Sequence, residues 1–438
     1  MIQSFKQKLG EEYKSYSLAE KLFIFAMMIC TFATTSEAAI TRAVANSVFL
    51  TTYTADFFPF VWLVSVPINF AIVVFYNRFL PTFGCGKMLL LSMLITGSLN
   101  AFSAFYLQSI SFLPFILYLW KDIFVILLFQ QIWSVIHATS NTSRAKYLYG
   151  IVFGAGGIGS VFGNAVPAFF AVTIGSEKLL LFTLPLHILL VTFYFFGLFI
   201  REKIPTRQNI AHLNKGSTDM LEGLKLIHSS KFLIFILLIV LGMQIGSTLM
   251  DYQFSIYLQK IYMNQDIRTQ FLGQFYGIVN IFNIFLQFIG SYVLLHLLGL
   301  QFSHLLIPFI LIINCLGCML FPNFKMMSFS FGTIKALDYS VFGIIKEMLY
   351  IPLKVKEKFK AKAFIDVFAY RSAKACASLV IIVLQFFSFI RLELLLSWML
   401  FLIFVTWMGA VIFLFKYYQK EVDNQHINWP ESIITTSK

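Results

Sequence analysis

The sequence predicts an all-α membrane protein with about twelve membrane-spanning helices. Hydrophobic residues make up 59% of the 438 residues and the mean hydropathy is +0.80. Charged residues are only 12%, about half of the roughly 25% found in soluble domains. A soluble core of this composition would leave more apolar surface than water tolerates. The apolar runs have about the 20-residue length of a membrane helix, unlike the short alternating strands of a barrel.

Charged residues lie mainly between the apolar runs. With the N-terminus inside, 22 Lys and Arg residues fall in cytoplasmic segments and five in external loops, while six lie within spans. Basic residues concentrate in cytoplasmic loops, so we expect a multi-pass protein of the bacterial inner (cell) membrane with both termini in the cytoplasm. The predicted spans are 22–43, 55–79, 88–110, 112–137, 147–173, 178–200, 231–259, 270–297, 302–322, 327–353, 363–390 and 392–416.

The longest polar interruption, 201–231, divides the chain into six spans and six spans. This is the layout of two parallel repeats in the major facilitator fold. Residues 144–146, Arg-Ala-Lys, precede the fifth span, and residues 360–362, Lys-Ala-Lys, precede the eleventh. We therefore predict a cytoplasmic N-terminal segment at 1–21, a six-helix half at 22–200, a central cytoplasmic loop at 201–230, a second six-helix half at 231–416 and a cytoplasmic tail at 417–438.

Ionisable residues at membrane depth are costly, so each is a candidate functional residue. The tenth span carries a basic and aromatic stripe at 100° per residue. Lysine supplies point charge to phosphate, and tyrosine can stack on a base. The alternative is a set of interhelical salt bridges in which Asp338 and Glu347 are the acidic partners. The stripe consists of Lys335, Tyr339, Lys346 and Tyr350.

The eleventh and fourth spans carry further charges. Arg371 and Lys374 are three residues apart and share a helix face, and Asp366 is placed to restrain Lys374. Lys121 and Asp122 are adjacent, which puts them on different faces. The other ionisable residues named at this depth are Glu37, Arg42 and Asp251.

No catalytic constellation is present in the sequence. There is no Walker A loop, no HExxH and no Ser–His–Asp arrangement, so we expect neither an enzyme nor an ATP-driven pump, and no cofactor or metal. Cys315 and Cys318 have a metal-site spacing but no second ligand pair, which favours packing. The net charge of +13 is explained by topology rather than by nucleic acid. The expected partners are a small solute and the bilayer, and the expected state is a monomer.

The tenth-span charges belong to a longer motif. It runs through residues 346–353, KEMLYIPL, continues with residues 360–366, KAKAFID, and ends with Arg371 and Lys374. The motif resembles the signature of the ATP/ADP antiporter family of intracellular bacteria and plastids. The resemblance implies a major-facilitator-like fold of twelve helices that carries nucleotides.

Depth, charge and resemblance together give the predicted site. We assign substrate binding to Arg42, Lys335, Tyr339, Lys346, Tyr350, Arg371 and Lys374. We assign charge balance or coupling to Asp122, Asp251, Asp338, Glu347 and Asp366. The chain departs from the family at Ala45, Asn46 and Ser255, where the resemblance implies Lys, Asp and Lys, and at Arg144, which replaces an acidic residue. Fewer cations favour a cargo less charged than ATP, such as a nucleoside monophosphate or a dinucleotide.

The predicted function is secondary transport, by alternating access, of nucleotides or a related phosphate-bearing metabolite. Two alternatives remain open. One is a proton-coupled carrier of a smaller solute, with Asp251 or Asp366 titrating. The other is a non-transporting membrane protein of the same fold, which the missing lysines would favour.

Overall fold

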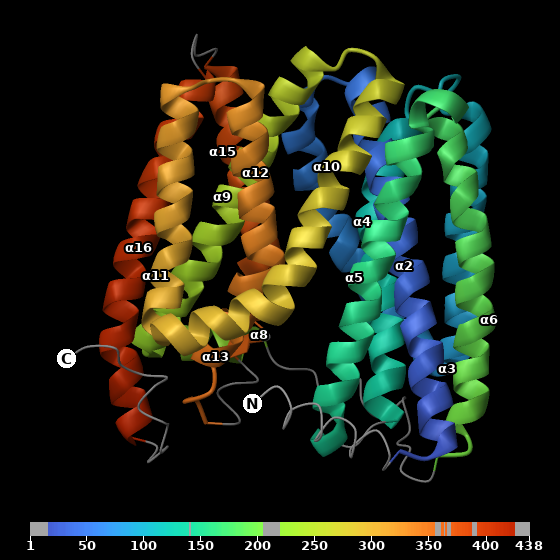
Figure 1. The fold of residues 1–438 in the computed structure, drawn as a ribbon, viewed down its shortest axis with the longest axis horizontal. Coiled ribbons are helices and arrows are strands. Elements are labelled where there is room, and N and C mark those ends of the chain that lie inside the picture. The colour runs from blue at the N-terminus through green and yellow to red at the C-terminus, as the bar shows by residue number, and fades with distance from the viewer. Residues whose placement is uncertain are drawn as a thin grey trace. The chain divides into compact units, whose positions relative to one another are not determined.

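The computed structural model describes residues 16–139, 142–204, 220–354, 361–362, 364–365, 369–387 and 392–424. Almost all of these residues are helical (Figure 1). The elements are α2 (Leu18–Thr52), η1 (Ala55–Phe57), α3 (Phe58–Tyr106), α4 (Leu113–Thr139), α5 (Thr142–Ile174), η2 (Glu177–Phe182), α6 (Thr183–Arg201), α8 (Met220–Ser229), α9 (Lys231–Ile261), α10 (Gln265–Phe285), η3 (Leu286–Gly290), α11 (Ser291–Leu320), α12 (Phe324–Leu337), η4 (Asp338–Phe342), α13 (Gly343–Leu349), α15 (Tyr370–Phe386) and α16 (Leu392–Asn424).

Nine helices in the described part are long and apolar enough to cross a membrane. One of them, Ala55–Tyr106, has 52 residues, which is about 78 Å of helix against a hydrocarbon core of about 30 Å. It therefore contains the predicted second and third spans. They meet at Gly84, whose φ of 74° and ψ of 164° leave the helical region.

A second bend has the same form. Gly299, inside α11, has φ 72° and ψ 176°, and it lies between the predicted eighth and ninth spans. This backbone region is essentially restricted to glycine. Each of the twelve predicted spans falls wholly or partly on described helical residues.

Large apolar side chains remain exposed along the helices. Phe169 of α5 is 71% exposed and Leu320 of α11 is 73% exposed. Such surface suits lipid and not water. Together with the helix lengths, it confirms the predicted all-α, multi-pass membrane protein.

The chain forms two compact units. The first unit contains residues 1–49, 70–216 and 265–277, and so holds most of α2, the second part of α3, α4, α5, α6 and the start of α10. The second unit contains residues 50–69, 217–264 and 278–438. Each unit thus includes a short stretch from the other half of the sequence. The predicted division at the 201–230 loop stays a prediction.

Close packing of α5 on α2 organises the first unit. A Cβ atom added at Gly159 or Gly163 would clash with the backbone of α2 at Phe32 or Ser36. The Ser36 hydroxyl donates a 2.9 Å hydrogen bond to the carbonyl of Gly159. The glycines of the fifth span therefore serve close helix contact, as small residues commonly do in membranes.

Candidate functional site

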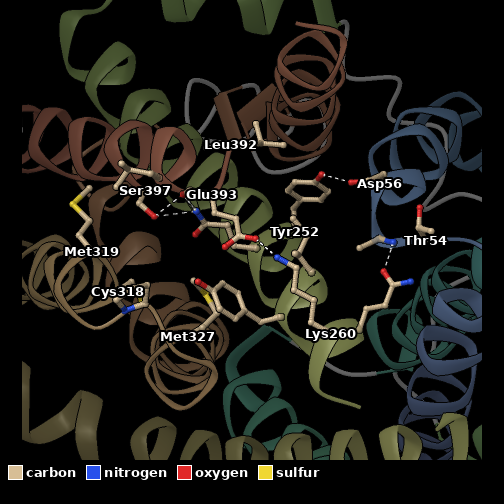
Figure 2. A pocket seen from close by; sticks show the side chains of 17 residues that line it. Thr54, Asp56, Tyr252, Lys260, Cys318, Met319, Met327, Leu392, Glu393 and Ser397 are labelled. Atoms are coloured by element: carbon tan, nitrogen blue, oxygen red, sulfur yellow. Dashed lines mark hydrogen bonds and ion pairs between the residues drawn. The ribbon is translucent and has the colours of Figure 1, made fainter. Parts of the chain in front are cut away.

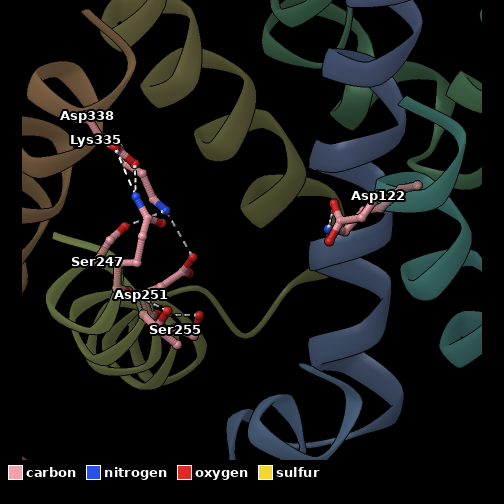
Figure 3. A network of polar contacts seen from close by, with 9 residues as sticks. Asp122, Ser247, Asp251, Ser255, Lys335 and Asp338 are labelled. Carbon is pink, nitrogen blue, oxygen red and sulfur yellow. Dashed lines mark hydrogen bonds and ion pairs between the residues drawn. The ribbon is translucent and has the colours of Figure 1, made fainter. Parts of the chain in front are cut away.

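The main polar cluster of the second unit centres on Lys335 of α12 (Figure 3). Its Nζ lies 3.5 Å from Oδ2 of Asp251 and donates a 3.0 Å hydrogen bond to the hydroxyl of Ser247. The Lys335 side chain is 13% exposed and that of Asp251 is 29% exposed. A lysine held by one partly exposed carboxylate remains accessible to a competing anion, because phosphate can take the place of the carboxylate.

Helix α9 presents a polar face to this cluster. Gln244, Ser247, Asp251 and Ser255 are spaced by three, four and four residues, so they lie on one side of the helix. Nε2 of Gln244 donates to Oδ1 of Asp338 at 3.2 Å. Sequence reasoning singled out Lys335, Asp338 and Asp251 separately, and the structure brings them together with two neutral partners that it missed, Gln244 and Ser247.

Aromatic rings flank the lysine. Nζ of Lys335 lies 5.3 Å from the ring centroid of Phe331 and 6.0 Å from that of Tyr339. The Tyr339 side chain is 48% exposed. Cation and open aromatic face therefore stand side by side, which is the combination needed for a phosphate joined to a planar ring.

The predicted stripe along the tenth span is not a single surface. A π-helical segment, Asp338–Phe342, interrupts the α-helix and changes its rotation relative to 100° per residue. Tyr339 is exposed, whereas Tyr350 is fully buried. Lys346 is partly buried beyond the π-helical segment. Glu347 does not serve as a partner of the stripe lysines in the way expected, because its carboxylate binds Lys362 at 2.5 Å.

The other predicted basic residues lie against aromatic rings. In the second unit, Nζ of Lys374 is 5.2 Å from the ring centroid of Trp62. In the first unit, the guanidinium carbon of Arg42 is 5.6 Å from that of Tyr276. The predicted residues Arg371 (its side chain) and Asp366 lie outside what the structure describes.

Lys121 and Asp122 of α4 form an ion pair, with 3.0 Å between Nζ and Oδ1. The prediction that they point to different faces was wrong, because the long lysine side chain turns back toward its neighbour. Nζ of Lys121 also lies 4.1 Å from the ring centroid of Tyr118. Lys121 is 7% exposed and Asp122 is 40% exposed in this pair.

The positions at which the chain departs from the antiporter motif are largely buried. Ala45 is fully buried and Ser255 is 5% exposed. The Ser255 hydroxyl donates to the backbone carbonyl of Asp251 at 2.8 Å. Neither position offers room for a lysine without local rearrangement, so the loss of the cations is accompanied by tighter packing.

The two halves of the sequence repeat their polar positions at a constant distance of 214 residues. The first and seventh spans carry an acid, the third and ninth an asparagine, the fourth and tenth a lysine, and the sixth and twelfth a hydroxyl residue. This constant offset supports the predicted parallel repeat. The pairs are Glu37 with Asp251, Asn100 with Asn314, Lys121 with Lys335, and Thr183 with Ser397.

A pocket of about 730 Å³ lies within the second unit at the ends of α9 and α11 (Figure 2). It includes the Lys260–Glu393 ion pair at 2.5 Å and the Tyr252 hydroxyl, which donates to Asp56 at 2.8 Å. Two carboxylates and one lysine give its lining a negative balance, which disfavours a phosphate. None of the predicted substrate-binding residues lines it.

Solved structures share the fold. A bacterial homologue of the iron transporter ferroportin in its inward-facing state has a TM-score of 0.60 at 12% identity, over 90% of this chain and all of that one. The proton:xylose symporter XylE of the major facilitator superfamily has a TM-score of 0.58 at 13% identity, over 91% and 95%. The helices and these likenesses define a membrane protein of the major facilitator fold.

Sequence comparison adds the family. Residues 330–418 match the family model described as "TLC ATP/ADP transporter". ADP,ATP carrier protein 3 of Rickettsia prowazekii is 25% identical over 348 residues, 69% of each chain. ADP,ATP carrier protein 1 of Rickettsia bellii is 24% identical over 235 residues, so the chain spans about half the length of that relative. The chain is a divergent member of the ATP/ADP transporter family, as the motif had indicated, and the comparisons point to a transporter rather than an enzyme.

Proposed function

We propose that this protein is a secondary transporter that carries a nucleotide, or a related phosphate-bearing metabolite, by alternating access. We place it in a bacterial inner membrane with both termini in the cytoplasm. One observation carries the proposal. Lys335, at membrane depth, is held by a displaceable carboxylate and lies beside an exposed aromatic ring. An intramembrane cation of this kind marks a solute site by default.

In the proposed bound state, a phosphate oxygen accepts the hydrogen bond of Lys335. Asp251 holds the lysine when the site is empty, so that the charge is never buried alone. Tyr339 offers its ring to the base. Lys346, Lys374, Arg42 and Arg371 are the proposed additional contacts to phosphate, and Tyr350 is kept only as a proposed packing residue behind the site.

The departures at Ala45 and Ser255 support a cargo with fewer charges than ATP. Each missing contact to a charged group corresponds to about 1.5–3 kcal/mol, or roughly one to two decades of affinity. We therefore propose a nucleoside monophosphate or a dinucleotide as the preferred cargo.

The test is a thermal-shift screen of the purified protein against nucleoside mono-, di- and triphosphates, NAD and sugar phosphates. A ligand at about 100 times its Kd stabilises the protein by roughly 2.7 kcal/mol. Lys335→Gln should remove this stabilisation. Lys260→Gln is the matched control, because Lys260 is also ion-paired but is 60% exposed. No stabilisation by any phosphate compound, or equal loss in both variants, refutes the proposal.

A further inference from the structure

We propose that Glu37 of α2 is a proton-binding site, which takes up and releases one proton during the transport cycle. The coupling to transport rests on the proposed function, but the proton site itself does not. Glu37 lies within the first unit and its side chain is 2% exposed. None of the residues assigned to substrate binding contacts it.

The hydrogen bonds of Glu37 leave one carboxyl oxygen open. Oε1 accepts from the Thr41 hydroxyl at 2.8 Å and from Nδ2 of Asn100 at 3.2 Å. Asn100 is oriented in turn by a 3.0 Å hydrogen bond to the Thr183 hydroxyl. Oε2 is buried and has no hydrogen-bond partner among the described residues. The donors thus define Oε1 as the acceptor and leave Oε2 to carry a proton.

No lysine or arginine of the described chain forms an ion pair with Glu37. Its one basic neighbour is His187 of α6, whose Nε2 lies 4.0 Å from Oε1. The His187 ring packs edge-on against Phe124, with 5.7 Å between centroids, and neither ring nitrogen has a hydrogen-bond partner in the described part of the structure. A buried carboxylate without a cation costs several kcal/mol, and protonation removes that cost.

The sequence repeat sharpens the contrast. Asp251, the counterpart of Glu37 at the offset of 214 residues, is neutralised by Lys335. The counterpart of Lys335 is Lys121, which pairs with Asp122 instead. In one half a lysine balances the acid of the first helix. In the other half the lysine is engaged elsewhere, and a proton is the charge that remains to balance the acid.

The helices around Glu37 offer few other titratable groups. The second part of α3 carries Lys87, which is exposed, and the described side chains of α5, at 150–174, include no charged residue. Helix α4 carries the Lys121–Asp122 pair. Helix α6 carries His187 and, at its end, Arg201, which donates to Thr139. On α2 itself, Arg42 lies against Tyr276. Glu37 and His187 therefore form the local titrating pair.

The chemistry is a simple acid dissociation. When the site is enclosed, the O–H bond at Oε2 is intact and the carboxyl is neutral. When a conformational change admits water, that bond breaks, the proton passes to water and the carboxylate is solvated. Re-enclosure reverses both steps. One proton per cycle is gained from one side and lost to the other.

The first experiment is infrared spectroscopy of the purified protein near neutral pH. We expect a protonated-carboxyl band that shifts in D2O and is lost in Glu37→Gln, which keeps the shape of the neutral acid. Thr41→Val should move the band, because it removes a hydrogen bond from Oε1. Glu177→Gln, a control in the same unit, should leave it unchanged. A spectrum unaffected by both Glu37→Gln and Thr41→Val overturns the proton site.

The second experiment measures coupling in liposomes that contain a trapped pH-sensitive dye. Addition of a nucleotide that the wild type transports should change the luminal pH, and Glu37→Gln should abolish the change while Glu177→Gln preserves it. Nucleotide movement without any pH change in the wild type overturns the coupling. If the wild type moves no nucleotide at all, the proposed function fails, and the infrared result still decides whether Glu37 holds the proton.

Discussion

Removal of either member of the Lys335–Asp251 pair should destabilise the protein, and removal of both should cost less than the sum. At 3.5 Å the attraction between unit charges is about 5 kcal/mol for an effective dielectric constant of 20. Desolvation and partial exposure reduce this value. Because Lys335 is 13% and Asp251 29% exposed, the net effect lies between a surface pair, about 0.5 kcal/mol, and a buried pair, about 3–5 kcal/mol.

We therefore expect Lys335→Gln and Asp251→Asn each to lower the free energy of unfolding by about 2 kcal/mol, with a coupling of about 1–2 kcal/mol between them. The assay is a double-mutant cycle of equilibrium unfolding in detergent micelles. Saturating cargo should reduce the coupling, because phosphate replaces Asp251 at the lysine. A coupling within about 0.3 kcal/mol of zero in the empty protein would contradict the pairing. An unchanged coupling in the presence of bound cargo would contradict the exchange of partners.

Three further predictions concern topology, packing and the altered motif. Reporter domains fused after Arg207 and at Lys356 should both report cytoplasm, and an external signal at either place breaks the twelve-span arrangement. Gly163→Val should destabilise the first unit by about 1–3 kcal/mol in thermal unfolding, because its Cβ meets the backbone of α2, whereas Gly150→Ala, which opens on free space, should not. Ala45→Lys should lower thermal stability without gaining ATP binding, since the position is fully buried; a gain in ATP affinity at unchanged stability would show that it faces the substrate.

The course of the helices could be predicted from sequence because lipid requires long apolar runs. What the sequence did not show was that neighbouring spans continue into one another through a single glycine. The expected connections near Gly84 and Gly299 are bends within helices. A loop and a bend have similar composition, and only the backbone angles distinguish them.

The candidate site was predictable residue by residue but not as an arrangement. Charge at membrane depth identified Lys335 and Asp251, since such residues are rare. Their pairing depends on which faces of α9 and α12 meet, and periodicity gives a face without its neighbour. His187 was missed because one histidine in an apolar run carries no spacing signal. The constant offset of 214 residues would have directed attention to Glu37, whose counterpart is acidic.

The two glycine bends have a practical consequence for work on this protein. At Gly84 an added Cβ atom would meet nothing within 4 Å, so substitution there is opposed by backbone angle and not by space. A residue other than glycine in this region costs on the order of 1–3 kcal/mol. The spans on either side of each bend are joined without slack, so epitope tags, protease sites or split-protein junctions placed at Gly84 or Gly299 would disturb the fold. Although both places look like open turns in the sequence, they are poor insertion points.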